Sequence, residues 1–335
     1  MQYFWKKSPP PPEGRTKSYA DLQRQILELT AQAEVLRKKE LAEFAGKFPE
    51  EFEIGTYRLI HEDLADLHDE QLRAHYSAHG ASEGRRANRL KDRQDFAALA
   101  RLGGRVLEIG PFANPILSPG GNIEYADWLD QSALVARAIS LGIDASRVPY
   151  IKHVLSKKPL SQIDDDYNSI ISSHNIEHQP DLIGHLLDVE KLLRARGGVY
   201  FILAPDKRYC FDRDVPLTTV AELVEAHELK ASRHSLRNII YHRAYTTHND
   251  AYLHWAERGL MRNCQPRPDA VKAAVEEWRQ ARGQYIDVHA WYFTPDHFVS
   301  LMEAIKNLGY ISMSVERIYP TRKGSAEFWA IMAPS

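Results

Sequence analysis

The chain has 335 residues, about twice the length of a typical single domain, which favours one large domain with an accessory module. Hydrophobic residues make up 44% and charged residues 26% of the chain. This ordinary globular composition excludes a chain disordered throughout, a collagen and a coiled-coil rod. The formal net charge of -2 gives no global electrostatic reason to expect a nucleic-acid partner.

Cysteine content and hydropathy indicate the cellular setting. The two cysteines, Cys210 and Cys264, allow neither a disulfide framework nor a four-cysteine zinc site. Apolar runs such as residues 199–204 are too short to cross a bilayer, and the N-terminus lacks the apolar core of a signal peptide. We therefore expect a cytoplasmic protein with no transmembrane segment.

Two segments at the N-terminus are expected to lie outside any compact domain. Residues 1–17 contain four consecutive prolines and predict a flexible, proline-rich tether. In residues 18–47, apolar side chains recur at alternating steps of four and three from Leu22 to Leu36, which predicts an amphipathic helix. We favour a helix docked on its own chain, and a coiled coil that joins two copies in a homodimer is the alternative.

Residues 48–90 are expected to form a small helical module. Asp69 is a plausible N-cap for a helix that carries His75 and Tyr76, and Gly80 is a plausible end of it. The stretch is similar to a short module of bacterial proteins of surface-polysaccharide assembly. The residues that carry this similarity are Tyr57, Asp63, Leu64, His75, Tyr76, Gly80, Glu83, Gly84 and Arg85.

The remainder, residues 95–335, predicts an α/β domain with a parallel sheet covered by helices on both faces, because short apolar runs alternate with helical stretches. A helical insertion at 206–285 is expected to form a lid or a substrate domain before the last strands. Predicted strands cover 105–110, 122–127, 148–155, 168–174 and 199–205, with further strands at 287–293, 311–319 and 327–333 and helices at 180–196 and 295–307.

The turn after the first predicted strand has the features of a nucleoside site. Glu108 precedes the turn that begins with Gly110 and Pro111, and such a turn lets backbone approach a ligand closely. Asp127 ends the second strand, where a carboxylate can accept both hydroxyls of a ribose. The turn contains one glycine, so we expect a nucleoside without phosphates in preference to a dinucleotide.

The motifs VLEIGP, EYAD, IISSHNIEH and LRARGGVYFILAPDKR occur in the order typical of class I S-adenosylmethionine-dependent methyltransferases. Over residues 100–335 the chain resembles that family, most closely its branch in bacterial glycan gene clusters. The resemblance implies a Rossmann-like, seven-stranded sheet with the last strand antiparallel and S-adenosylmethionine as cofactor. The implied cofactor contacts are Glu108, Gly110, Pro111, Asp127 and Ser173, with His174 also next to the donor methyl. The family's later loop glycines are replaced here by Phe112 and Asn114.

Candidate catalytic groups follow the fourth predicted strand. His174 and His178 have the ordinary pKa that suits a general base near neutral pH, and we favour that role. We expect no metal, although His174, Glu177 and His178 would share one face of a helix and could hold a divalent ion. A third interpretation, in which they only support the start of a helix, stays open.

The segment after the fifth strand supplies the remaining candidates. Asp206 is expected on the rim of the pocket, where it would orient or deprotonate the acceptor. Lys207 and Arg208 would pair with a phosphate or uronate of the substrate, or else form a solvated turn. His289, at the start of the sixth predicted strand, is expected to point back toward the substrate.

These observations and the resemblance together predict an enzyme that methylates a hydroxyl of a saccharide in lipopolysaccharide or a related bacterial surface glycan. Its partners would be a saccharide, nucleotide-sugar or glycan acceptor and glycosyltransferases, and not a nucleic acid. A small-molecule or lipid O-methyltransferase is one alternative. A non-catalytic, methyltransferase-like scaffold in a glycan assembly complex is the other, favoured by the loss of the loop glycines.

Overall fold

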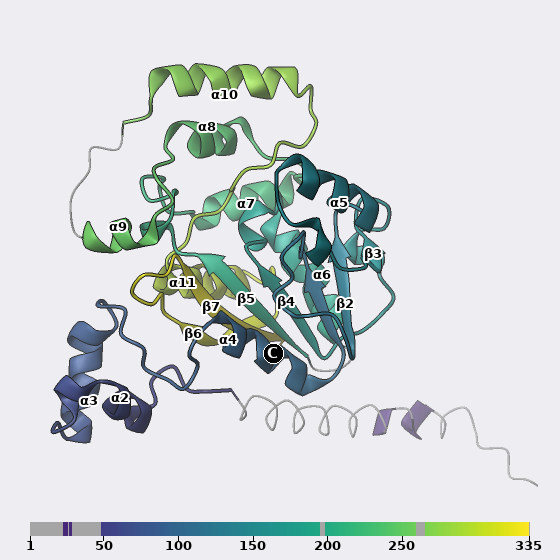
Figure 1. Ribbon diagram of the computed structural model, residues 1–335. Helices are drawn as coiled ribbons and strands as arrows, with labels where there is room; N and C mark the ends of the chain where they lie inside the picture. Colours follow the sequence, from purple (N-terminus) through teal and green to yellow (C-terminus); the bar gives the residue numbers. More distant parts are fainter. Residues whose placement is uncertain (1–22, 26, 29–47, 195–197, 259–264, 335) are drawn as a thin grey trace, which may run out of the picture.

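The computed structural model describes residues 23–25, 27–28, 48–194, 198–258 and 265–334 (Figure 1). The tether predicted at 1–17 lies outside the described residues, as does most of the helix predicted at 18–47. The homodimer expected through that helix therefore stays a prediction.

The centre of the protein is one seven-stranded sheet with the order β3-β2-β1-β4-β5-β7-β6. β7 runs antiparallel to both of its neighbours, and the other pairs are parallel. This confirms the predicted α/β sheet with an antiparallel last strand. The strands are β1 (Val106–Ile109), β2 (Ile123–Asp127), β3 (His153–Val154), β4 (Ser169–Ser173), β5 (Val199–Pro205), β6 (Met313–Tyr319) and β7 (Glu327–Pro334).

One predicted strand is wrong, and the strand predicted at 148–155 is reduced to the two residues of β3. Residues 287–293 form coil that is exposed at Asp287 and buried from Val288 onward, and an isolated bridge pairs Phe293 with Asp206 next to β5. Their amides are satisfied elsewhere: Ala290 donates to the Glu177 carbonyl (2.7 Å) and Tyr292 to the Thr218 hydroxyl (2.8 Å). His289 therefore does not begin a strand, and β6 starts at Met313.

Helices cover both faces of the sheet (Figure 1). Along β5, Tyr200 and Ile202 pack with the helices α6, α7 and α11, whereas Phe201 and Leu203 pack on the face covered by α4. Burial on both faces explains why this strand is a continuous apolar run. The helices are α4 (Arg93–Leu99), α5 (Gln131–Ser140), α6 (Leu182–Arg194), α7 (Val220–Glu228) and α11 (Pro295–Asn307).

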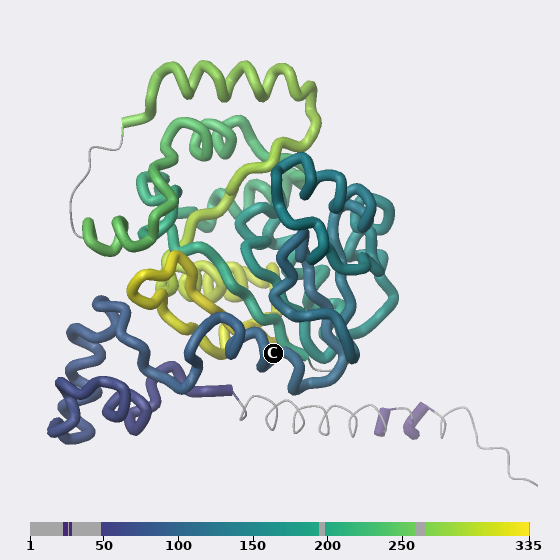
Figure 2. The backbone as a smooth tube through the Cα atoms, viewed as in Figure 1, coloured from purple at the N-terminus to yellow at the C-terminus, as the bar shows by residue number. Residues whose placement is uncertain are grey.

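The predicted insertion is not a single unit. Leu223 of α7 belongs to the main core, so the first helix of this segment is part of the layer that covers the sheet. Beyond the end of β5, α8 and α10 pack through Ile239 and Ala274 and form a separate layer (Figure 2). This layer consists of α8 (Leu236–Ala244) and α10 (Pro268–Gln280), whereas Trp255 of α9 (Ala251–Ala256) stacks on Tyr209 just after β5.

Short single turns complete the described secondary structure. They are η1 (Glu62–Leu64), the π turn η2 (Tyr76–Gly80), η3 (Ala100–Gly103), η4 (Ala145–Arg147), η5 (Leu160–Gln162), η6 (Ile176–His178) and η7 (Lys207–Tyr209). Among the helices that the structure describes, none combines the length and apolar character needed to span a membrane.

The N-terminal module consists of α2 (Ile54–Ile60), α3 (Asp69–His75) and η2 around the buried ring of Tyr57. His75 bonds the Tyr57 hydroxyl through Nδ1 (3.1 Å), and Tyr76 stacks on Phe52 with centroids 4.7 Å apart. The motif residues of this module are therefore packing residues. The N-cap of α3 is His68, one residue before the predicted Asp69.

The module also borders the edge strand β6. The Tyr319 hydroxyl donates to the Pro49 carbonyl (2.7 Å), and the Ile318 amide donates to the Glu51 carboxylate (2.8 Å). Arg317 pairs with Glu50 at 3.0 Å. Residues 49–51 thus cover hydrogen-bonding groups of the outermost strand.

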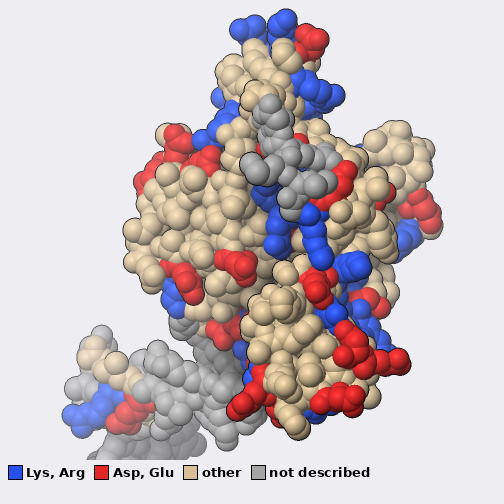
Figure 3. Space-filling view, turned by 90° about the vertical axis from the view of Figure 1, so that its left-hand side faces the viewer, with Lys and Arg blue, Asp and Glu red and all other residues tan. Residues whose placement is uncertain are grey.

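The arginines that precede the main domain are paired with acidic side chains. Arg85 contacts Asp63 at 2.7 Å, and Arg89 contacts Glu53 at 2.9 Å. Acidic and basic side chains are also intermixed on the face seen in Figure 3. Arg85 and Arg89 are therefore part of the module's own charge pairing.

Replacing Gly80 by alanine should destabilise the module, because an added Cβ would lie 2.2 Å from the Tyr57 hydroxyl oxygen. Overpacking of this kind costs about 1–3 kcal/mol, which denaturant unfolding would measure. The matched control is Gly55→Ala in α2, whose Cβ would meet nothing within 4 Å. Equal stability of the two variants would contradict this account of the packing.

Candidate functional site

The turns after β1 and β4 pack against each other at the carboxyl edge of the sheet. Gly110 has a φ of 73°, and a Cβ at this position would lie 2.6 Å from the Asn175 side-chain nitrogen. The Gly110 amide also donates to the Ala126 carbonyl of β2 (2.8 Å). The predicted turn glycine is thus required both by its backbone conformation and by the close approach of the neighbouring turn.

Glu108 organises the loop that follows β1. Its two carboxylate oxygens accept the amides of Ile116 (2.7 Å) and Leu117 (3.0 Å). Burial raises the pKa of this carboxyl to about 7, against the opposing effect of the two amides. Glu108, predicted to contact the cofactor, therefore fixes the conformation of this loop. Pro111 in the same loop is also buried.

Asp127 holds the same loop from the end of β2. Its Oδ2 accepts the amide of Phe112 (3.1 Å), whose φ of 45° is the left-handed conformation rare for a residue with a side chain. The carboxylate is 9% exposed, and burial raises its pKa. The predicted ribose residue thus lies at the expected edge with one oxygen engaged by backbone.

Ser173 contacts Arg93, which in turn pairs with Glu327, and the sequence patterns reveal neither of these two partners. Arg93 of α4 donates to the Ser173 hydroxyl (2.5 Å), and its Nε lies 3.5 Å from Glu327. Glu327 begins β7, which is antiparallel, so it reaches the edge where β4 and β5 end. Neither residue is near the predicted motifs in sequence, and only the strand order brings them to this edge.

His174 lies between two carboxylates. Its Nε2 is 3.0 Å from Glu327, and its Nδ1 is 3.4 Å from Glu177. Burial alone would lower the pKa of His174, but these carboxylates raise it to about 10. The two carboxylates therefore favour the protonated imidazole, and the general-base role expected for His174 stays a prediction. The φ of His174, 51°, is also the strained left-handed conformation.

His174, Glu177 and His178 do not share one face of a helix as predicted, because the helical turn η6 begins only at Ile176. His178 instead turns toward Asp287, with Nδ1 to Oδ1 at 3.0 Å, and this carboxylate raises the pKa of His178 against the effect of burial. Its ring also packs edge-on against that of His289, with centroids 4.6 Å apart.

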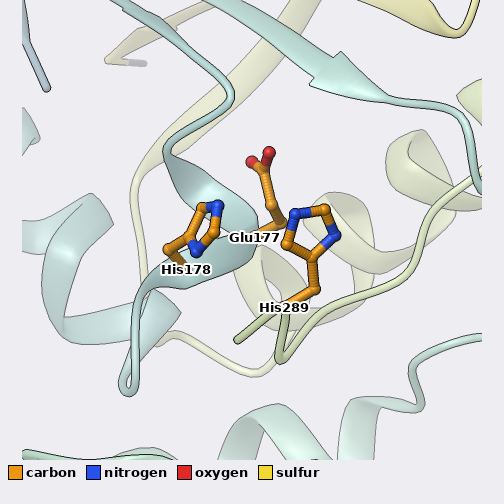
Figure 4. A group of neighbouring side chains, drawn as sticks. All are labelled: Glu177, His178 and His289. Carbon is orange, nitrogen blue, oxygen red and sulfur yellow. The ribbon is translucent and has the colours of Figure 1, made fainter. Parts of the chain in front are cut away.

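His289 joins this group from the coil that precedes α11. Its Nδ1 lies 2.6 Å from Oδ2 of Asp212, and both side chains are buried. Figure 4 shows Glu177, His178 and His289 around one common space. His289 therefore lies beside η6, and its expected orientation toward a substrate stays a prediction.

The charged residues after β5 are engaged with each other. Asp206 is fully buried, not on a rim, and accepts from Arg208 (2.6 Å) and the Thr321 hydroxyl (2.7 Å). Lys207 donates to the Arg213 carbonyl (2.6 Å). A direct role for these three predicted residues in acceptor binding or proton transfer would require release of those partners.

No family model and no curated protein matches the chain. Among solved structures it is similar to the CcbJ methyltransferase from Streptomyces caelestis, at 9% identity over 72% of this chain and 94% of that one, with a TM-score of 0.38. An S-adenosylmethionine-dependent methyltransferase from Clostridium acetobutylicum ATCC 824 gives 10% identity over 79% and 98%, with a TM-score of 0.37. Putative Zn-dependent alcohol dehydrogenases from Rhodobacter sphaeroides give 13% over 74% and 91%, with a TM-score of 0.39. Because these identities and TM-scores are low, we describe the fold from the topology of the sheet itself.

The charge pairing of His174 predicts a pH dependence of stability. The contribution of the His174–Glu327 pair to the free energy of unfolding needs ionised Glu327. It is therefore present above pH 4.5, the ordinary pKa of glutamate. Because the pKa of His174 is raised, this stabilising contribution is complete below pH 6.5, the ordinary pKa of histidine, and is lost as the pH rises through about 10. We expect Glu327→Gln to be least stable relative to wild type near pH 6 and to approach it above pH 10, as chemical denaturation would measure.

Proton NMR titration of His174 provides the direct check. Glu327→Gln should move the midpoint toward the ordinary value of 6.5, whereas Glu316→Gln, at an exposed position of β6, should not change it. An ordinary His174 midpoint in the wild-type protein would contradict the interpretation.

Proposed function

We propose that this protein is an S-adenosylmethionine-dependent methyltransferase that O-methylates a saccharide of a bacterial surface glycan. The observation that carries the proposal is the edge of the sheet at β1 and β4, where the strand order reverses. Ligands of open α/β sheets bind outside the carboxyl ends of strands at such a point. The turn at Gly110 and the carboxylate of Asp127 lie there, as a nucleoside site requires.

Acidic side chains at this edge suit a sulfonium donor. Asp127 ends β2, Glu177 follows β4, and Glu327 begins β7. In the reaction a bond forms between the acceptor oxygen and the methyl carbon while the sulfur–carbon bond breaks. The hydroxyl proton is released, and the sulfonium becomes a neutral thioether. Alignment of the two reactants can supply roughly 7–11 kcal/mol of such a barrier.

Activation of the acceptor falls to the groups around η6. The carboxylates of Glu177 and Glu327 favour the protonated form of His174, which suits this ring to orient the two carboxylates. The space bounded by Glu177, His178 and His289 adjoins the end of β4. An acceptor hydroxyl that entered there would approach the donor from the side of the insertion.

Support for a saccharide comes from Tyr285, which is 45% exposed beside this corner. Its hydroxyl lies 3.2 Å from Asp287 and 3.4 Å from the His178 carbonyl. An aromatic face next to a carboxylate can stack on a sugar ring and accept bonds from its hydroxyls. The specific glycan class rests on the family resemblance of residues 100–335 and of the N-terminal module.

A non-catalytic scaffold is the second candidate. The observation that favours it is that Glu108 and Asp127 already accept backbone amides within the protein. In that case the loop would be complete without a nucleoside. Binding of S-adenosylmethionine therefore separates the two candidates.

Isothermal titration of the full chain with S-adenosylmethionine should show one binding event. Asp127→Ala should weaken it about 10- to 100-fold, because hydrogen bonds to charged groups contribute about 1.5–3 kcal/mol. Glu303→Gln, at an exposed position of α11, is the matched control and should bind as wild type. A folded wild-type protein that does not bind would favour the scaffold.

Acceptor chemistry needs a separate measurement, the release of S-adenosylhomocysteine with candidate acceptors. We expect turnover with a nucleotide sugar or an oligosaccharide, and loss of at least tenfold in kcat/KM for Tyr285→Ala. Turnover with a lipid or small phenol alone would favour the alternative O-methyltransferase.

A further inference from the structure

We propose that Glu177, His178 and His289 form a binding site for a divalent transition-metal ion of the zinc type. In each residue one ligand atom, a carboxylate oxygen or a ring nitrogen, lies within 4.8 Å of those of the other two. Two of the residues come from η6 and the third from the coil before α11. Binding of the ion is inferred from the residues themselves, and only its catalytic use rests on the proposed methyltransferase function.

The buried carboxylate of Glu177 is the first argument. The side chain is fully buried, and neither of its oxygens accepts a hydrogen bond among the described residues. His174 faces one oxygen at 3.4 Å, outside hydrogen-bonding geometry. A buried, incompletely partnered carboxylate is costly, and a cation bound beside it would remove that cost.

The second argument is how the two imidazoles are held. Nδ1 of His289 forms a hydrogen bond with Asp212 (2.6 Å), whereas Nδ1 of His178 lies 3.0 Å from Asp287 as an ion pair outside hydrogen-bonding geometry. This leaves Nε2 of each ring for the common space, and Figure 4 shows one nitrogen of each ring turned toward it, near the Glu177 carboxylate. A carboxylate on the far nitrogen is the usual support for histidines that bind metals.

The donor set indicates the kind of ion. Two imidazoles and one carboxylate suit zinc and similar transition metals better than magnesium or calcium. Ligands in such sites lie roughly 2.0–2.2 Å from the ion. The three atoms would therefore have to move somewhat closer together, which side-chain rotation allows. Three protein ligands leave a coordination position for the acceptor hydroxyl, which the ion would polarise and acidify.

A competing group of Asp212, His242 and His289 is less suitable. The His289 amide already donates to Nδ1 of His242 (3.1 Å), and Asp212 is engaged by His289. The metal site considered from the sequence, with His174 in place of His289, is also less suitable, because the His174 ring is held between Glu177 and Glu327. The test therefore has to distinguish His289 from His174 as a ligand.

The experiment uses the full chain, stripped with a chelator and titrated with Co²⁺, whose visible absorption reports coordination by nitrogen. We expect one Co²⁺ per chain, displaced by Zn²⁺. His178→Gln and His289→Gln should each weaken binding by at least tenfold. His227→Gln, whose ring pairs with Asp181 instead, is the matched control and should bind as wild type.

A further variant separates coordination from folding. Asp212→Asn keeps all three ligands and should weaken Co²⁺ binding about 10- to 100-fold, the usual effect of removing a partner of a liganding histidine. Circular dichroism and thermal unfolding would show that each variant is folded. If the wild-type protein takes up no Co²⁺, or if His174→Gln abolishes binding while His289→Gln does not, the proposed site is wrong.

Failure of this site and failure of the proposed function give different results. Uptake of Co²⁺ without binding of S-adenosylmethionine would retain the metal site and remove the methyltransferase. Binding of S-adenosylmethionine without uptake of Co²⁺ would retain the enzyme and overturn the metal site.

Discussion

Buried carboxylates that accept backbone amides are the constraint on which the functional edge of this protein depends. Glu108 lies within β1, one residue before its end, and Asp127 ends β2, and both hold the loop that begins at Gly110. The amides they accept come from residues that have no regular secondary structure of their own. Without these two side chains the loop would have no fixed conformation, and the turn after β4 would have no fixed surface to pack against.

The same edge shows how charge is distributed among the carboxylates. Glu327 and Glu177 share the cation of His174, while Asp212 and Asp287 each engage one further histidine. Acidic groups therefore alternate with imidazoles from η6 to the start of α11. Such an arrangement keeps several ionisable groups close together around the buried side chains of Glu177, Asp212 and His289. Perturbed pKa values and chemical function often coincide in such clusters.

Local sequence patterns were sufficient for most strands and for the loop residues, because continuous apolar runs and a glycine turn depend on near neighbours. They failed for residues 287–293, whose apolar pattern reflects burial in coil and not pairing in the sheet. They also could not reveal Arg93, Glu327 or Asp212. These residues reach the site only through the order of the strands and the path of the insertion. Patterns of nearby residues in the sequence cannot predict such long-range contacts.

The contact of residues 49–51 with β6 has a consequence for the solution behaviour of the chain. An outermost strand offers unpaired amides and carbonyls to any other extended chain, and proteins avoid this self-association by covering such strands. Here the Glu51 carboxylate occupies the Ile318 amide, and Glu50 pairs with Arg317 beside it. A protein shortened beyond Glu51 would keep its sheet but lose this shield against intermolecular strand addition.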